Sequence, residues 1–323
     1  MRKKILLFII GLIVSVILLL VVLNNFNLRE FANRIIGIKA DEIVYFFLLI
    51  ILLILIRGLR WGYISGLSIS IKNILFLFKC ISIGAFFNSI IPFGAGELYR
   101  INALKVRTKT GYGKATSTIV IERIIDMIFL FFLVIFISFF LPFPNWVNNL
   151  LFLVGSIIVI FICVLFFIRK NTIEKIIIKC NNKILKGILN FIKSFIIGFS
   201  DFRTSNRKIE IILSTLFYWF VSSWIVLVKG NMLNIILTPK VIFIIMALVN
   251  LSAIIPATPG MFGTYHAAVY TSLSIFGFSE NDCQDYAVFS HLTNYVSMVL
   301  VGGILWFGQL IKILINRRNE STT

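Results

Sequence analysis

Two long apolar runs in this sequence are interrupted by proline and glycine, and the interruptions limit how the chain can fold. The first broken segment is IIPFGAG at 90–96, and the second broken segment is IIPATPG at 254–260. In both, a proline follows two isoleucines and a glycine follows that proline by four residues. Proline and glycine free backbone groups that hydrocarbon cannot satisfy, so such backbone survives inside a membrane only where protein or a cavity surrounds it. A pair of such segments in two halves of a chain therefore indicates a binding site.

The composition places nearly the whole chain in a membrane. Of the 323 residues, 59% are hydrophobic and 14% are charged, and the mean hydropathy is +1.00. Several apolar runs reach the ~20 residues that a helix needs to cross a bilayer. No polar stretch approaches the ~50 residues of a small soluble domain. The sequence thus predicts an all-α, polytopic membrane protein with one integral membrane domain over 1–323, and it excludes a conventional soluble catalytic module.

Charge asymmetry around the apolar runs sets the predicted topology. Lysine and arginine gather on one side of the spans, which is the positive-inside pattern, so both termini are expected on the cytoplasmic side of the cell membrane. The formal charge of +18 also suits an anionic lipid surface, and we expect no nucleic-acid partner. The six predicted spans are 5–23, 43–59, 115–140, 150–168, 209–228 and 287–311.

The broken segments are predicted to lie in two re-entrant hairpins. The run at 80–99 has basic residues on both flanks, so it should enter and leave on the cytoplasmic side. The run at 241–276 lies in a stretch with no lysine or arginine between Lys240 and Lys312, so it should enter from outside. Two short tilted spans in place of each hairpin fit the same pattern. Opposed hairpins are what an inverted repeat would give, and the residues expected to break them are Pro92, Pro256 and Pro259.

The longest polar region, 169–208, is basic and has apolar residues at helical spacing. This pattern predicts an amphipathic helix on the cytoplasmic leaflet. The four cysteines show no CxxC spacing, and the two histidines lie far apart in sequence, so we expect no disulfide pair, metal or cofactor. The apolar positions of the predicted helix are Ile177, Ile184, Ile188, Phe191 and Phe195.

Three motifs resemble elements of one family, the lysylphosphatidylglycerol synthase transmembrane region, whose members are also called flippase-like membrane proteins. They are NSIIPFGAGELYR at 88–100, ERIID at 122–126 and IPATPGMFGTYH at 255–266. They occur in the family's order and the match covers most of the chain. The resemblance implies a polytopic protein that moves or handles anionic or isoprenoid lipids. This chain has His266 where many members have glutamate, and Met261 where glycine is common.

In the multi-domain synthases this membrane domain precedes a soluble aminoacyl-transfer domain. The present chain ends shortly after its last predicted span. We therefore expect no aminoacylation chemistry. The resemblance leaves a separate soluble transferase at the cytoplasmic face as a possible partner.

Arg100 and Arg123 are the predicted ligands of a lipid phosphate, because a guanidinium binds phosphate in a forked geometry. Glu97, three residues before Arg100, is expected to orient it. The alternative is that Arg100 is an ordinary basic flank and Glu97 its surface partner. Backbone close to the headgroup is expected at the glycines of the hairpin tips, which are Gly94, Gly96, Gly260 and Gly263.

Glu122 and Asp126 lie within an apolar run and share one helix face at i, i+4. An unpaired charge there costs at least ~2.5–3.5 kcal/mol, so both need partners, and Arg123 or Arg100 are the candidates. The two carboxylates serve either in a structural ion-pair network or in substrate or proton coupling. His266 is either a satisfied hydrogen-bonding group or a group that exchanges protons. Arg57 and Arg60 are interpreted as anchors at the inner interface.

The favoured hypothesis is a lipid flippase or transporter of an anionic phospholipid or isoprenoid phosphate. The sequence has no GxxxxGK[ST] motif for ATP, so movement should be passive or coupled to an ion gradient through Glu97, Glu122, Asp126 or His266. One rival is an integral membrane enzyme of lipid-linked sugar metabolism, although we find no catalytic constellation. The other rival is a membrane scaffold that presents a soluble transferase on region 169–208.

Overall fold

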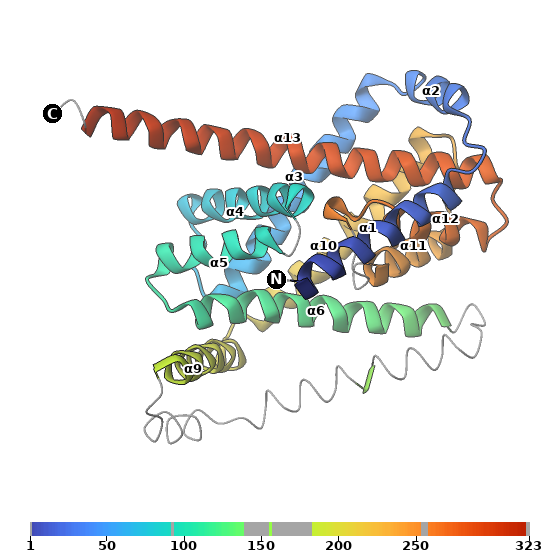
Figure 1. The fold of residues 1–323 in the computed structure, drawn as a ribbon. Coiled ribbons are helices and arrows are strands. Elements are labelled where there is room, and N and C mark those ends of the chain that lie inside the picture. Colours follow the sequence, from blue (N-terminus) through green and yellow to red (C-terminus); the bar gives the residue numbers. More distant parts are fainter. Residues whose placement is uncertain (1, 92–93, 139–154, 157–182, 253–257, 321–323) are drawn as a thin grey trace. The chain divides into compact units, whose positions relative to one another are not determined.

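The computed structural model describes residues 2–91, 94–138, 155–156, 183–252 and 258–320. Within these ranges every regular element is a helix (Figure 1), which confirms the all-α prediction. The helices are α1 (Arg2–Val22), α2 (Leu28–Ile36), α3 (Ala40–Ser65), α4 (Ile71–Ile90), α5 (Ala95–Thr108), α6 (Tyr112–Ser138), α9 (Lys183–Thr204), α10 (Lys208–Met232), α11 (Pro239–Ser252), the 3-10 turn η1 (Pro259–Met261), α12 (Thr264–Ser274) and α13 (Glu280–Glu320).

Four of the described helices are long and apolar enough to cross a membrane, namely α3, α4, α10 and residues 280–316 of α13. Shorter apolar helices cover 11–22 and 239–252. The helix before the first broken segment begins at Ile71, earlier than the predicted start at 80, because the apolar pattern extends past Lys79. The predicted span 150–168 and the start of region 169–208 lie outside the described helices. The re-entrant hairpins stay a prediction.

The chain divides into two compact units, and the boundaries fall inside α3, α4 and α5. Unit 1 consists of residues 1–54, 81–96 and 219–323, and unit 2 consists of residues 55–80 and 97–218. The single integral domain over 1–323 stays a prediction.

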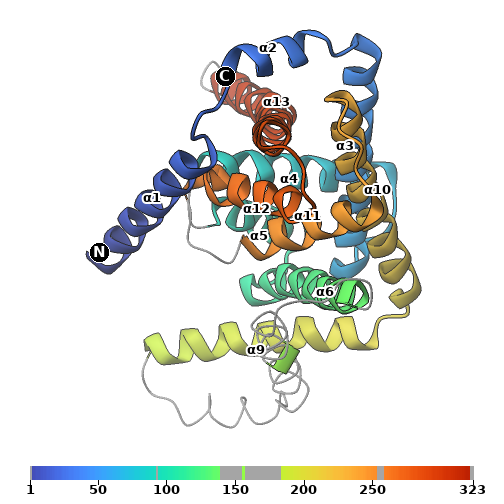
Figure 2. The same ribbon diagram turned by 90° about the vertical axis from the view of Figure 1, so that its right-hand side faces the viewer.

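Unit 1 is built around α12, which packs against α1, α11 and α13 (Figure 2). The Tyr286 hydroxyl of α13 donates to the Val226 carbonyl of α10 at 2.8 Å. Ser279 caps the start of α13, since its hydroxyl accepts from the Asp282 amide at 3.1 Å. These contacts hold the last helix of the chain against the middle of the unit.

An ion-pair cluster joins α2 to the first turns of α13 in unit 1. Asn27 caps α2 by accepting from the Glu30 amide at 3.2 Å. Arg34, near the end of α2, contacts Asp282 at 2.7 Å and Asp285 at 3.2 Å. The hydrogen bond to Asp282 is the main reason that the pKa of Arg34 is raised. The cluster ties the segment after α1 to α13.

Unit 2 includes α9, which packs across α6 (Figures 1 and 2). The contact is close because Gly198 of α9 faces Ser117 of α6, and Lys114 pairs with Asp201 at 2.5 Å. Helix α9 falls within the predicted amphipathic region 169–208. It buries Ile196 and leaves a set of large apolar side chains exposed in its first half, namely Leu185, Ile188, Phe191 and Ile192.

Candidate functional site

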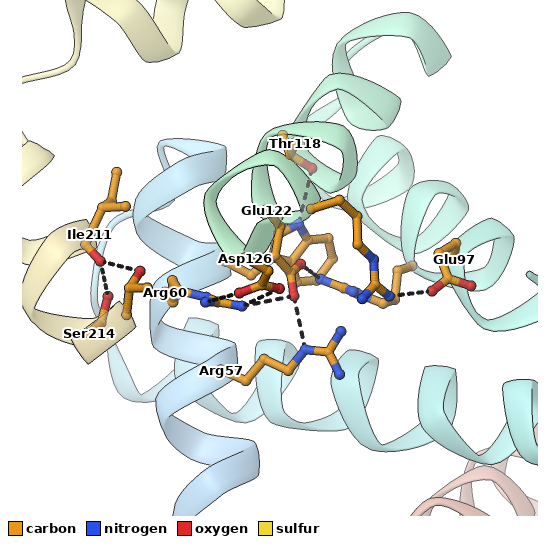
Figure 3. A network of polar contacts seen from close by, with 12 residues as sticks. Arg57, Arg60, Glu97, Thr118, Glu122, Asp126, Ile211 and Ser214 are labelled. Carbon is orange, nitrogen blue, oxygen red and sulfur yellow. Dashed lines mark hydrogen bonds and ion pairs between the residues drawn. The ribbon is translucent and has the colours of Figure 1, made fainter. Parts of the chain in front are cut away.

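The Glu122 carboxylate is the centre of a buried charge network in unit 2 (Figure 3). Its side chain, on α6, is 0% exposed. Arg57 Nε donates to it at 2.9 Å and Arg60 Nη2 at 3.5 Å, both from α3. Arg100 Nη2 of α5 donates to the other carboxylate oxygen. Three arginines from two helices therefore surround one carboxylate.

Asp126 lies one helical turn after Glu122 and binds one of the same arginines. Arg60 donates to its two oxygens at 2.6 and 3.2 Å, which is the forked geometry that guanidinium and carboxylate share. The Arg60 side chain is 0% exposed, and its guanidinium also lies 4.7 Å from the centre of the Tyr218 ring. The pair fixes α3 against α6.

Trp61 gives the network an aromatic wall. Its indole Nε1 donates to Thr118 Oγ1 at 3.0 Å, and that hydroxyl donates to the Ala115 carbonyl at 2.8 Å. The Arg100 guanidinium lies 4.4 Å from the centre of the indole ring, in the range of a cation–π contact. Trp61 is fully buried. The Arg100 guanidinium is therefore held by Glu122 on one side and by the indole ring on the other.

A more exposed pair lies at the edge of the network, where Arg123 Nη2 donates to Glu97 Oε1 at 2.8 Å. The two side chains are 49% and 24% exposed. This contact brings Glu97 and Arg123, both singled out from the sequence, into one place. The orienting role of Glu97 toward Arg100 stays a prediction.

The network holds more arginine than carboxylate. Its four arginines carry one more charge than its three carboxylates, which are Glu97, Glu122 and Asp126. Within the described residues, the Nη atoms of Arg57 make no hydrogen bond, and they point away from Glu122 (Figure 3). The Nε atoms of Arg60 and Arg100 are buried without a hydrogen-bond partner in the described part of the chain. The network thus contains guanidinium donors that have no hydrogen-bond partner among the described residues.

Two sequence-based assignments change with this geometry. Arg57 and Arg60, interpreted as interface anchors, are partners of Glu122 and Asp126. The physical reason is that α3 turns Gly58 toward Leu77 of α4 and directs the two arginines, at i, i+3, toward α6. Asp126 pairs with Arg60, not with the expected Arg123 or Arg100. The available signal was that both pairs lie about one helical turn apart, the arginines at i, i+3 and the carboxylates at i, i+4.

The second broken segment lies in unit 1, against α1 and α13. Gly263 has φ of +84°, and a Cβ there would overlap the backbone of Ser15 in α1, so only glycine fits. His266 Nδ1 accepts from the Gly263 amide at 3.4 Å. His291 Nε2 of α13 contacts the Gly260 carbonyl at 2.7 Å. The rings of His266 and His291 lie 4.6 Å apart, centre to centre.

The second broken segment meets the end of α4 in unit 1, directly before the first broken segment. A Cβ added to Gly260 would lie 3.3 Å from the carbonyl oxygen of Ser89, at the end of α4. After α4, Gly94 has φ of +73°, and the Gly96 amide donates to Asn88 Oδ1 at 2.8 Å. Pro259 begins η1, whereas Pro92 and Pro256 lie outside the described residues.

Sequence reasoning missed Lys229, which is buried near the end of α10 in unit 1. The predicted span 209–228 ends one residue before this lysine. A single lysine between Val228 and Gly230 in an apolar run was the available signal.

These features define an integral, polytopic membrane protein. It has apolar helices of membrane length, a buried network of ion pairs, and a second broken segment that meets the end of α4. The chain belongs to the lysylphosphatidylglycerol synthase TM region family, whose model matches residues 8–302. This confirms the resemblance seen in the three motifs.

Two relatives are UPF0104 membrane proteins of Methanocaldococcus jannaschii. MJ1595 is 27% identical over 317 residues, which cover 91% of this chain and 92% of the relative. MJ1078 is 28% identical over 240 residues, which cover 73% of this chain and 99% of the relative. No solved structure matches the chain.

Proposed function

We propose that this protein is a flippase-like membrane protein that binds an anionic lipid, a phospholipid or an isoprenoid phosphate, and moves it between leaflets. The observation that carries the proposal is the excess of arginine over carboxylate in the network around Glu122. A buried excess of positive charge in a membrane is costly unless an anion balances it. A lipid phosphate is the anion that a membrane supplies.

Arg57 is the foremost candidate to receive the phosphate. Its Nε is held by Glu122 at 2.9 Å, while its side chain stays 23% exposed and its Nη atoms point away from that carboxylate. Arg100 and Arg123 are the further headgroup ligands in this proposal, and the lipid tails stay in hydrocarbon. The carboxylates set the arginine positions before the lipid arrives, so little conformational entropy is lost on binding.

The meeting of Gly260 with the end of α4 supports the lipid-moving part of the proposal. Broken helices that face each other at a repeat interface are the usual architecture of a transporter's binding site. Movement is passive or is coupled to an ion gradient through Glu97, Glu122, Asp126 or His266. In this proposal the protein acts in the cell membrane with both termini in the cytoplasm.

The test is a scrambling assay in proteoliposomes with fluorescent phosphatidylglycerol and, separately, a fluorescent isoprenyl phosphate. The wild-type chain should move at least one probe between leaflets. Arg57→Met should slow that movement by about tenfold or more, because a hydrogen bond to a charged group contributes about 1.5–3 kcal/mol. Lys72→Met is the matched control, since Lys72 is exposed on α4 and should leave the rate unchanged.

Arg100→Ala and Arg123→Ala extend the assay to the other two ligands. An equal rate for Arg57→Met and the wild type would remove Arg57 from the headgroup site. Failure of folded wild-type protein to move either probe would refute the lipid-moving proposal. The enzyme and scaffold hypotheses would then lead, and a search for a soluble partner would follow.

A further inference from the structure

Lys229 is an amine buried between helices of unit 1, with only 2% of the residue exposed. Its Nζ donates to the Ser290 carbonyl at 3.1 Å and to Asn294 Oδ1 at 2.6 Å, both on α13. Both acceptors are uncharged. The proposed lipid site in unit 2 makes no use of this residue.

No carboxylate in the described part of the chain contacts Lys229. On α13, the titratable side chains around it are Tyr286 and His291, and Asp285 is already paired with Arg34 at 3.2 Å. On α12, Tyr265 is linked to Lys229 through Asn294, and His266 contacts His291. On α3, the Phe46 ring faces Nζ at 5.4 Å from its centre, and the Tyr45 hydroxyl accepts from Trp224 Nε1.

The number of hydrogen-bond donors on Lys229 depends on whether it carries a proton. A neutral amine has two N–H groups, and the two oxygen acceptors satisfy both. An ammonium has three, and the third faces the Phe46 ring, where a cation–π contact offsets part of its burial. The N–H groups of both the neutral amine and the ammonium therefore have partners. The amine can gain or lose a proton without a large rearrangement around Nζ.

A proton is the ligand that this site can take. A buried cation without a counter-ion is costly, so a bound anion would be the other solution. However, Nζ is enclosed by α13 and the Phe46 ring. An anion needs space beside the amine, whereas a proton from bulk water adds to the nitrogen lone pair and needs none.

One side chain connects Lys229 to the second broken segment. Asn294 accepts from Lys229 through Oδ1 and donates through Nδ2 to the Tyr265 hydroxyl at 3.1 Å. Tyr265 lies on α12, two residues after Gly263. One turn before Asn294, His291 holds the Gly260 carbonyl at 2.7 Å. A change at the amine can thus reach the first turn of α12, directly after the second broken segment, through Asn294 and Tyr265.

We propose that Lys229 is a proton-binding site in unit 1, and that a proton taken up there changes the packing of the second broken segment through Asn294 and Tyr265. The neutral amine accompanies the packing seen here. The ammonium turns its third N–H toward Phe46 and makes the hydrogen bond to Asn294 Oδ1 charge-assisted, which alters the contact that the same amide makes through Nδ2 with Tyr265. This proposal stands independently of lipid movement.

The test compares the unfolding midpoints of the purified full chain and its Lys229→Met variant in detergent between about pH 5 and pH 9. The difference between the two midpoints should change by a few degrees across this range, because the folded and unfolded states bind protons differently at Lys229. Lys240→Met is the control, since Lys240 is exposed, and its difference from the wild type should stay constant. A constant difference for Lys229→Met would overturn the proposal.

A second variant keeps the test decisive if Lys229→Met does not fold. Asn294→Asp places a carboxylate beside the amine, so it should hold the proton and remove the contribution of Lys229 to the pH dependence of the midpoint. Hydrogen exchange of residues 258–266, compared between Asn294→Asp and wild type at each pH, reports the link to the broken segment. The ratio of the exchange rate in Asn294→Asp to that in the wild type should change with pH. A ratio that stays constant would refute the link between Lys229 and the broken segment.

Discussion

Replacing Glu122 by glutamine should lower the free energy of unfolding by about 3–5 kcal/mol, the cost of removing one partner from a buried ion pair. Glutamine keeps the size of the side chain and removes its charge. Arg57, Arg60 and Arg100 would then lose the carboxylate that they share. The measurement is chemical or thermal unfolding of the purified variant in detergent, followed by tryptophan fluorescence and helical circular dichroism.

Glu97→Gln is the matched control for this change. It removes the same charge from the same network, but Glu97 and Arg123 are 24% and 49% exposed. A solvated pair of this kind contributes about 0–1 kcal/mol. If Glu97→Gln and Glu122→Gln lowered the free energy of unfolding by similar amounts, Glu122 would not be the centre of the network.

Gly302→Ala should lower the unfolding free energy by about 1–3 kcal/mol, the usual cost of overpacking. Gly302 lies on α13 in unit 1, where an added Cβ would overlap the carbonyl oxygen of Ser82 in α4 and lie 2.5 Å from Phe86 Cβ. The Ser82 carbonyl is backbone and cannot rotate away. Relief therefore requires α13 and α4 to separate, which an unfolding curve measures directly.

Gly308→Ala provides the comparison on the same helix. A Cβ at Gly308 meets no atom within 4 Å, so alanine should stabilise α13 by about 0.5–1 kcal/mol through its higher helix propensity. Opposite signs for the two substitutions would establish the close approach of α13 and α4. If Gly308→Ala lowered the free energy of unfolding as much as Gly302→Ala, the effect would come from alanine within α13 and not from contact between α13 and α4.

The helical architecture was predictable because it depends on local properties. Apolar runs of membrane length form helices whatever their neighbours are, and α3, α10 and α13 follow those runs. The end of α4 at Ile90 was predictable too, since proline cannot continue the helix. The exact start of a helix was less predictable, as α4 shows, because one exposed basic residue such as Lys79 does not end an apolar helix.

The charge network was only partly predictable, because ion pairing depends on which faces meet. The need of Glu122 and Asp126 for partners followed from desolvation alone. The identity of those partners did not, since Arg57 and Arg60 lie 62 to 66 residues earlier in the chain. Lys229 was missed for a related reason. A lysine at the end of a span fits an interfacial anchor until helix packing shows that α13 covers it.

The order of the charges along the chain has a consequence for biogenesis. Arg57 and Arg60 leave the ribosome before Glu122 and Asp126, which neutralise them. Helix α3 therefore reaches the insertion machinery with two uncompensated cations, and its release into lipid becomes more favourable when α6 arrives. Nascent chains that stop before Tyr112 should hold α3 in the membrane less efficiently than chains that extend through Ser138. Protease protection of stalled translation products would measure that difference.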